Sequence, residues 1–218
     1  MRLDEARRDL YRRLAREQGY KSRAAFKLLE ATERYEFIGK GARVLDLGAA
    51  PGGWMQVAAE LVGPEGRVVG VDLSPIHLKG KNLVSVKMDV HDQKLAAKVV
   101  QLLEGEADVI LSDLAPSVSG VWELDQTKQI DLTLRVLEIA QEVLKVSGSV
   151  FCKLFEGERS QDVRDEFRRQ YRSVRVVKPA ASRAASSELY YLCEGIRKGG
   201  PGRPSYPTAA DTADTTSA

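Results

Sequence analysis

Cysteine and histidine are scarce in this chain of 218 residues, which holds two of each. Cys152 and Cys193 lie far apart, and each stands in an apolar run. Their spacing is not that of a zinc site, and with only His77 and His91 beside them we expect no structural metal. We expect both cysteines to be reduced core residues of a cytoplasmic protein.

Long apolar segments are also missing. No apolar run approaches the roughly 20 residues that a helix needs to span a bilayer. The N-terminus carries charges but no apolar core, so it is not typical of a secretory signal. The composition, with 43% hydrophobic and 29% charged residues, is that of an ordinary globular protein, and we expect no membrane partner.

The net charge of +2 hides an uneven distribution. Residues 1–30 carry nine Lys and Arg against five Asp and Glu, and residues 153–183 carry nine against five as well. Two basic segments on a near-neutral body could form one patch for a polyanion such as RNA. The alternative is a pair of solvated helix faces, which charge alone does not exclude. The candidate phosphate contacts are the N-terminal helix together with Arg164, Arg168, Arg169 and Arg172.

Strand-like and helix-like segments alternate along most of the chain. Strands are expected at 42–48, 67–75, 83–90, 108–116, 149–155, 173–179 and 188–195, and helices at 21–35, 52–63, 94–105, 125–148 and 160–171. This alternation predicts an α/β fold, in which a mainly parallel sheet is covered by helices on both faces. The last two strands are joined by a short segment without helical pattern, which favours an antiparallel partner.

The chain divides into three parts by composition. Residues 1–20 are expected to form a basic N-terminal helix, and residues 21–197 the α/β domain. Residues 198–218 are rich in Gly, Pro and Thr and show no periodicity, so we expect a disordered tail.

The expected strands end in glycine and aspartate, where open α/β sheets bind their ligands. The first strand runs into "DLGAAPGGW", residues 46–54, whose glycines permit close approach of the backbone to a ligand. Asp72 ends the second strand and can accept hydrogen bonds from ribose hydroxyls. Asp89 follows the third strand, where it can meet an adenine amino group, and Asp113 follows the fourth.

Two nucleotide ligands are compatible with this arrangement. A dinucleotide fold needs G-x-G-x-x-G around a pyrophosphate, but this loop reads G-A-A-P-G-G. The carboxylates of Asp46, Asp72, Asp89 and Asp113 would repel a pyrophosphate. S-adenosylmethionine carries a sulfonium and an ammonium and no phosphate, so acidic strand ends suit it. A glycine-rich turn without any ligand is the structural alternative for the loop alone.

Lys153 stands in the middle of the apolar run "SVFCKLF". An unpaired buried ammonium is costly, and lysine is among the residues least often fully buried. In the common strand order of such sheets, Lys153 would face Asp113, whose carboxylate would offset part of the burial penalty. A structural ion pair or an edge lysine that reaches solvent is the alternative.

Six segments of the chain resemble the FtsJ/RrmJ (RlmE) family of ribosomal RNA large-subunit 2'-O-ribose methyltransferases. They are "SRAAFKLLE", "VLDLGAAPGGW", "VDLSP", "SDLAPSVSG", "KLFEG" and "SRAASSELYYL". The resemblance implies a class I S-adenosylmethionine-dependent methyltransferase (Rossmann-like) fold with a seven-stranded, mainly parallel sheet whose last strand is antiparallel. It implies a catalytic tetrad of Lys27, Asp113, Lys153 and Glu188. The expected cofactor contacts are Asp46, Gly48, Ala49, Pro51, Gly52, Gly53, Trp54, Asp72, Leu73, Asp89, Val90 and Asp113.

This resemblance predicts methylation of a ribose 2'-hydroxyl, expected on a uridine of 23S ribosomal RNA, by a monomer that uses S-adenosyl-L-methionine. Lys153 is the expected general base. Desolvation and the neighbouring Lys27 would favour its neutral amine, whereas Asp113 and Glu188 oppose this and orient it. The alternatives are 2'-O-methylation of another RNA (a tRNA anticodon loop or an mRNA cap) and a non-catalytic ribosome-assembly factor. A dehydrogenase fits least.

Overall fold

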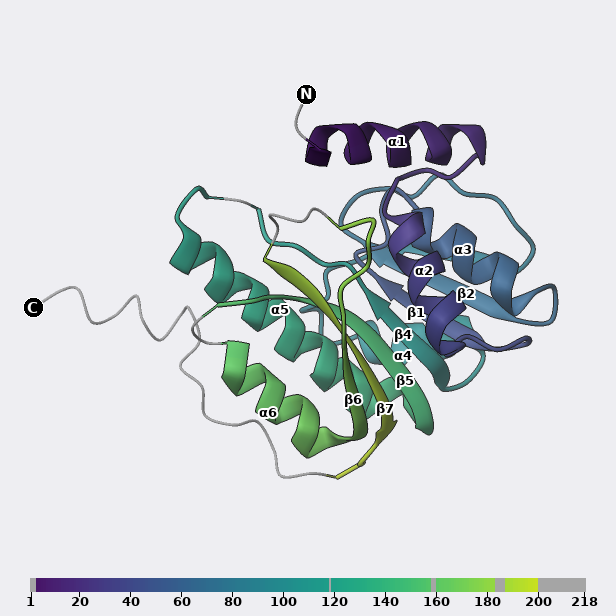
Figure 1. The fold of residues 1–218 in the computed structure, drawn as a ribbon. Helices are drawn as coiled ribbons and strands as arrows, with labels where there is room; N and C mark the ends of the chain where they lie inside the picture. The colour runs from purple at the N-terminus through teal and green to yellow at the C-terminus, as the bar shows by residue number, and fades with distance from the viewer. Residues whose placement is uncertain (1–2, 118, 158–159, 183–186, 200–218) are drawn as a thin grey trace, which may run out of the picture.

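Seven strands form one sheet in the order β3-β2-β1-β4-β5-β7-β6. The computed structural model describes residues 3–117, 119–157, 160–182 and 187–199 (Figure 1). β1 to β5 run parallel to one another, and β7 is antiparallel to both β5 and β6. The strands are β1 Arg43–Leu47, β2 Arg67–Asp72, β3 Leu83–Lys87, β4 Ala107–Ser112, β5 Leu144–Phe155, β6 Tyr171–Val177 and β7 Glu188–Ile196. The expected seven-stranded, mainly parallel sheet is confirmed.

Two apolar cores cover the two faces of the sheet, because successive side chains of a strand point to opposite faces. One core joins α2 and α3 to residues such as Val44, Val109 and Phe151. The other joins α4, α5 and α6 to the intervening residues, such as Leu45 and Ile110. The helices are α1 Leu3–Glu17, α2 Ala25–Tyr35, α3 Gly53–Val62, α4 Leu95–Leu103, α5 Trp122–Val143 and α6 Ser160–Gln170.

The boundary between the long helix and the fifth strand differs from the expectation. A helix was expected over 125–148, but α5 spans Trp122–Val143 and β5 begins directly at Leu144. Val146, Ser147 and Gly148 are poor helix formers, and Leu144 pairs with Ala107 of β4 beside an irregularity in that strand. Pairing with β4 therefore ends the helix at Val143, and the residues that follow belong to β5.

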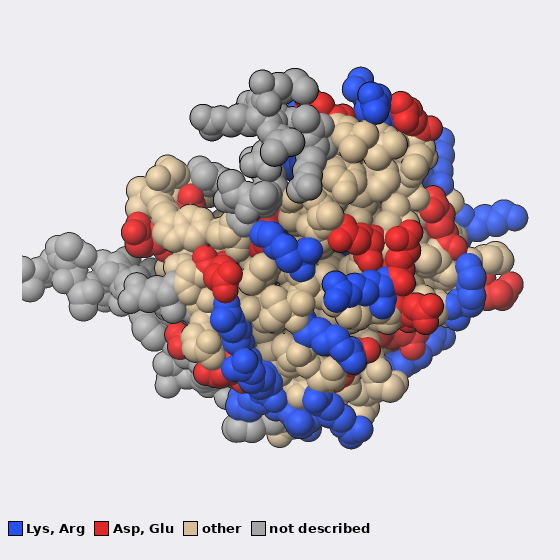
Figure 2. All heavy atoms as spheres, viewed as in Figure 1, with Lys and Arg blue, Asp and Glu red and all other residues tan. Residues whose placement is uncertain are grey.

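The two basic segments of the sequence lie at different places in the fold. α1 runs along the top of the molecule and α6 lies at the lower left (Figure 1). Figure 2 shows a row of Lys and Arg along the lower left of this face, with others at its upper edge and right side. The arginines of α6 are ion paired as Arg164–Glu156, Arg168–Asp165 and Arg169–Glu166. The basic helices α1 and α6 thus lie in different parts of the molecule.

The expected disordered tail lies outside the described residues from residue 200 onward. Among the helices that the structure describes, none is long and apolar enough to cross a membrane.

Candidate active site

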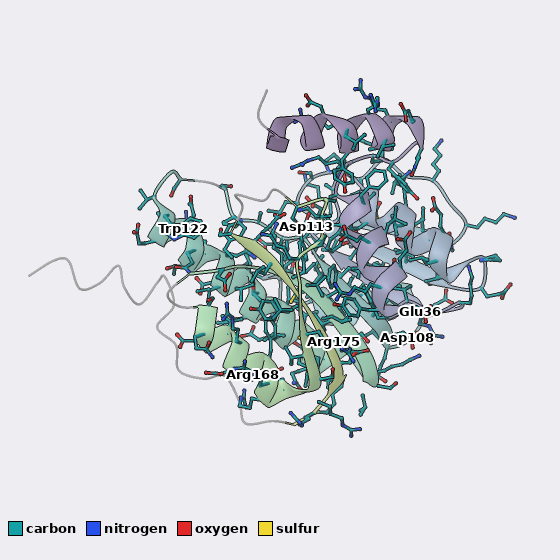
Figure 3. All side chains as sticks on the ribbon, in the orientation of Figure 1. Glu36, Asp108, Asp113, Trp122, Arg168 and Arg175 are labelled. Carbon is teal, nitrogen blue, oxygen red and sulfur yellow. The ribbon has the colours of Figure 1, made fainter. Side chains whose placement is uncertain are left out.

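The sheet register brings Lys153 and Asp113 together at the carboxyl edge of the sheet. Ser112, the last residue of β4, pairs with Cys152 of β5, so the residues that follow them are neighbours. The Lys153 Nζ lies 3.0 Å from the Asp113 Oδ1 and donates a hydrogen bond of 2.8 Å to the Asp113 carbonyl oxygen. Asp113 lies near the top of the sheet, at the opposite end of β4 from Asp108 (Figure 3).

Lys27 and Glu188 join the same cluster from α2 and β7. The Lys27 Nζ lies 2.8 Å from the Glu188 Oε1 and donates to the Tyr190 hydroxyl at 2.9 Å. That hydroxyl in turn donates to the Asp113 Oδ1 at 2.7 Å. The four residues expected as a tetrad are therefore brought together, and Tyr190 connects their two ion pairs.

Sequence reasoning missed Tyr190, although a signal was available. In a strand, residues two apart point to the same face, so Tyr190 shares a face with Glu188. The register also sets Tyr190 directly opposite Lys153. A buried tyrosine usually finds a partner for its hydroxyl, and here the partners are a lysine and an aspartate of the cluster.

The cluster is sheltered from solvent and balanced in charge. Lys27 and Lys153 are only 7% and 6% exposed. Burial alone would raise the pKa of Asp113, but Lys153, Lys27 and the hydrogen bonds from Tyr190 and Lys153 outweigh it and lower the pKa. Burial, together with Asp113 and Glu188, raises the pKa of Tyr190 well above 10, so its hydroxyl remains a donor.

The glycine-rich loop enters α3 beside this cluster. Gly48 and Gly52 have φ of 77° and 110°, in the left-handed region that favours glycine. Gly52 and Gly53 are buried, and Gly53 lies so close to Ser22 that a Cβ would come within 2.4 Å of the Ser22 Oγ. The loop and the start of α2 thus need glycine for their packing as well as for any ligand.

Trp54, an expected cofactor contact, lies in the core. It is 3% exposed, and its Nε1 donates to the Ala24 carbonyl oxygen at 2.7 Å. Its ring packs against those of Phe151 and Tyr190. The structure therefore supports a role for Trp54 in fixing α2 and Tyr190 against the sheet.

Asp72 and Asp89, at two of the acidic strand ends, accept hydrogen bonds from backbone N–H groups. Asp72 accepts hydrogen bonds from the backbone N–H of Ala50 at 2.9 Å and of Ser74 at 2.7 Å, which ties β2 to the glycine-rich loop. Asp89, which is exposed, accepts one from His91 N–H at 2.9 Å. Each carboxylate oxygen has a second lone pair, so both side chains keep acceptor capacity for a ligand.

Asp46 has no hydrogen-bond partner on either carboxylate oxygen within the described part of the chain. It is 1% exposed, and burial, with Asp113 and Asp72 nearby, raises its pKa well above the ordinary 3.8. Buried polar groups are normally hydrogen bonded. An unpaired carboxylate beside two others is suited to a cationic ligand.

The other expected contacts take different positions. Leu73 is 62% exposed beside Asp72, as a residue that covers a ligand would be. Val90 is buried in the core next to Asp89, and its carbonyl oxygen accepts a hydrogen bond from the Arg135 Nε at 2.7 Å. Ala49 is buried and Pro51 exposed at the turn.

Among the residues that the structure describes, no three of His, Cys, Asp and Glu form a group that could hold a metal ion.

Comparison with known proteins agrees with this geometry. The sequence model of the FtsJ-like methyltransferase family matches residues 20–196. The chain is 43% identical to the ribosomal RNA large subunit methyltransferase E of Nitrosopumilus maritimus, over 90% of this chain and 99% of that protein. It is 45% identical to the enzyme of the same name from Cenarchaeum symbiosum, over 90% and 100%.

Solved structures support the fold. A Plasmodium falciparum protein described as a ribosomal RNA methyltransferase superposes with a TM-score of 0.71 at 24% identity, over 81% of this chain and 98% of that one. The fibrillarin pre-rRNA processing protein of Methanococcus jannaschii superposes with a TM-score of 0.57 at 14% identity, over 80% and 77%. The family match covers all of the residues placed in the site. The chain belongs to the FtsJ-like methyltransferase family.

Proposed function

We propose that this protein transfers the methyl group of S-adenosylmethionine to a ribose 2'-hydroxyl of large-subunit ribosomal RNA. The observation that carries the proposal is the chain of contacts from Lys153 through Asp113, Tyr190 and Lys27 to Glu188. Such a chain holds two buried amines at the edge of a sheet where a nucleoside can bind. The names of the archaeal relatives favour ribosomal RNA as the substrate.

The residues at the strand ends fit S-adenosylmethionine. Its ammonium and sulfonium would meet the carboxylates of Asp46 and Asp113, and its ribose hydroxyls and adenine would meet Asp72 and Asp89. Leu73 would cover the adenine. When bound, this group supplies an electrophilic methyl carbon on a cationic sulfur. The buried Asp46 side chain, whose oxygens have no partner in the described part of the chain, would gain one from such a cation.

Lys153 is placed to act as the general base. A neutral amine has two N–H donors and one lone pair, and the Asp113 side chain and carbonyl offer acceptors for both donors. The lone pair then points in the remaining tetrahedral direction, where it can accept the proton of a 2'-hydroxyl. Holding the hydroxyl in line with the methyl carbon contributes further to the rate.

Lys27, Glu188 and Tyr190 position the reacting groups. Lys27 brings a second amine to the cluster and contacts Tyr190 and Glu188. Glu188 holds Lys27, and Tyr190 carries a hydrogen bond from Lys27 to Asp113. A substitution of Lys27, Glu188 or Tyr190 is expected to slow methyl transfer because it displaces Lys153 and Asp113.

The RNA itself is expected to reach the site from the side of α1, which lies above Asp113 in the view of Figure 3. Arg12, Arg13 and Arg16 of this helix are exposed and can contact phosphates, although Arg12 is paired with Asp9 and Arg13 with Glu17. We propose a cytoplasmic monomer that modifies a uridine. A transfer RNA, an mRNA cap or a purely structural role in ribosome assembly would replace this substrate if large-subunit RNA is not methylated.

The proposal is tested by two measurements on the whole protein. S-adenosylhomocysteine should raise the melting temperature, whereas NAD should not. Radiolabelled methyl groups should then pass from S-adenosylmethionine to large-subunit RNA, with affinity for RNA falling steeply as salt rises. Stabilisation by NAD alone, or binding of S-adenosylhomocysteine without transfer to any RNA, would contradict the proposal.

A further inference from the structure

We propose that the rings of Phe155 and Trp122 bind a nucleobase of the RNA substrate by stacking, beside the ribose that Lys153 deprotonates. The inference rests on the proposed function and names a part of its substrate site. We call these two rings the aromatic edge.

Phe155 links the aromatic edge to the reaction centre. Residues 153 and 155 of β5 point to the same face of the sheet, and the Lys153 Nζ lies 5.8 Å from the centre of the Phe155 ring. In a nucleotide, the carbon that bears the 2'-hydroxyl is bonded to the carbon that bears the base. A ribose whose hydroxyl meets Lys153 therefore brings its own base, or the next one, to this ring.

Trp122 extends the surface outward. Its ring is nearly parallel to that of Phe155, with 6.1 Å between the centroids and 21° between the planes. Trp122 is nevertheless 45% exposed, and it lies at the same upper end of the molecule as Asp113 (Figure 3). Val121 and Leu124 beside it are 54% and 41% exposed, so this surface is apolar where a solvated helix start would be polar.

The position of Trp122 is fixed by the turn that precedes α5. Asp125 accepts hydrogen bonds from the backbone N–H of Ser119 at 2.8 Å, from its hydroxyl at 2.7 Å and from Gly120 N–H at 3.3 Å. Gly157, just after β5, lies so close to the Gln126 amide that a side chain there would collide with it. The exposed indole is therefore held in place at the end of β5.

A nucleobase suits this surface better than a phosphate or a protein side chain. Asp125 is hydrogen bonded as above and Glu156 is paired with Arg164, whereas Glu123 beside Trp122 is exposed and would repel a phosphate, so the flat apolar rings are what the surface offers a ligand. Aromatic rings bind single-stranded RNA by stacking with little dependence on base identity. Enzymes that act on RNA also recognise unstacked bases in this way.

Fluorescence can test the stacking directly, because the chain has two tryptophans and Trp54 is buried. Saturating single-stranded oligouridylate should quench the emission of the wild-type protein, as a base stacked on the indole does. An abasic ribose-phosphate oligomer of the same length should not. The quenching should disappear in Trp122→Phe, whose remaining emission comes from Trp54. Emission from Trp122 that is unchanged by saturating oligouridylate would overturn the inference.

Kinetics with naked large-subunit RNA give the second readout. Trp122→Ala should raise the KM for RNA by about tenfold or more with little change in kcat, and Trp122→Phe should keep the KM within about threefold, because it retains a ring. Val176→Ala is the matched control, since Val176 is an apolar residue of β6 that is 54% exposed; its KM should not change.

Three outcomes separate the possibilities. An unchanged KM in Trp122→Ala overturns the inference while methyl transfer still supports the proposed function. A defect of Trp122→Ala on assembled subunits but not on naked RNA would mean that the surface contacts a ribosomal protein, and it too overturns the inference. If the wild-type protein transfers no methyl group, the proposed function fails, and the fluorescence experiment still decides whether RNA stacks on Trp122.

Discussion

Lys153 and Asp113 are joined twice, through the carboxylate at 3.0 Å and through the main-chain carbonyl at 2.8 Å. The second contact does not depend on the charge of Asp113. It would remain if the carboxylate were protonated or replaced by an amide. The amine of Lys153 is thus oriented by one residue at two points, which leaves one tetrahedral direction for the substrate.

Replacement of Lys153 by methionine should abolish most of the activity. General-base catalysis contributes about 100-fold to 10,000-fold, so kcat should fall by at least about 100-fold. Binding of S-adenosylhomocysteine, measured by calorimetry, should change little. Lys145→Met is the matched control: Lys145 is on the same strand and is also paired with an aspartate, Asp108, but it lies at the far end of the sheet. Near-normal transfer by Lys153→Met would remove Lys153 from the mechanism.

Removal of the Tyr190 hydroxyl should weaken catalysis more moderately. Tyr190→Phe deletes the hydrogen bonds to Asp113 and from Lys27. A hydrogen bond to a charged group contributes about 1.5–3 kcal/mol, so we expect kcat to fall by about tenfold or more. The pKa of Asp113 should rise, which moves the acid limb of the pH–rate profile upward.

Tyr191→Phe provides the comparison for this change. Tyr191 is the next residue on β7, but it points to the other face, where its hydroxyl accepts a hydrogen bond from the Arg164 Nε at 2.7 Å. The substitution Tyr191→Phe therefore removes one tyrosine hydroxyl of the same strand without changing a contact of the cluster. Equal losses of kcat in both variants would show that Tyr190 supports only the stability of the sheet.

Asp46→Asn should stabilise the ligand-free protein at neutral pH. The pKa of Asp46 is raised above its ordinary 3.8 in the folded state, so wild-type stability falls as pH rises from about that value through the raised pKa. The amide carries no such charge. We expect a gain of about 1–3 kcal/mol at pH 8 that vanishes below pH 3.8, measured by urea unfolding.

The same substitution should weaken cofactor binding, because the carboxylate that would meet the cation is lost. S-adenosylhomocysteine should therefore stabilise Asp46→Asn less than the wild-type protein. A variant that is less stable than wild type at pH 8, or that binds S-adenosylhomocysteine equally well, would show that Asp46 is not reserved for a cationic ligand.

Asp113 should show the opposite pH dependence. Its pKa is lowered below the ordinary 3.8, so its stabilising contribution is complete above about pH 3.8 and is lost as pH falls through the lowered value. Asp113→Asn should be less stable than wild type at pH 7, and the difference should shrink in acid. Urea unfolding at pH 7 and near pH 3 measures this; a difference that grows in acid would contradict it.

The strands and most helices could be predicted because their signal is local. Apolar runs that end at glycine or aspartate marked β1, β2 and β4, and their burial on both faces explains the runs. The start of β5 could not be predicted, since Leu144 is apolar in either a helix or a strand. Its state is decided by pairing with Ala107, which lies far away in the sequence.

The residues of the site also divide into those that the sequence reveals and those that only the fold reveals. The four residues of the tetrad could be predicted through their resemblance to a family, and the cluster that they form agrees with it. Tyr190 was missed, although its spacing from Glu188 was a signal, and the unpaired state of Asp46 could not be predicted because it depends on where other strands place hydrogen-bond partners. A count of basic residues also could not show their ion pairs: Arg168 and Arg169 are paired with acids one turn away, as are Arg12 and Arg13 of α1.

The most direct test of the account is the position of the methyl group on the product. Large-subunit RNA methylated by the purified protein should be digested to nucleosides and analysed by mass spectrometry. The account predicts a methyl group on a ribose 2'-oxygen, present with the wild-type protein and lost with Lys153→Met. A methyl group on a base nitrogen or carbon, or a ribose methyl group that persists in Lys153→Met, would contradict it.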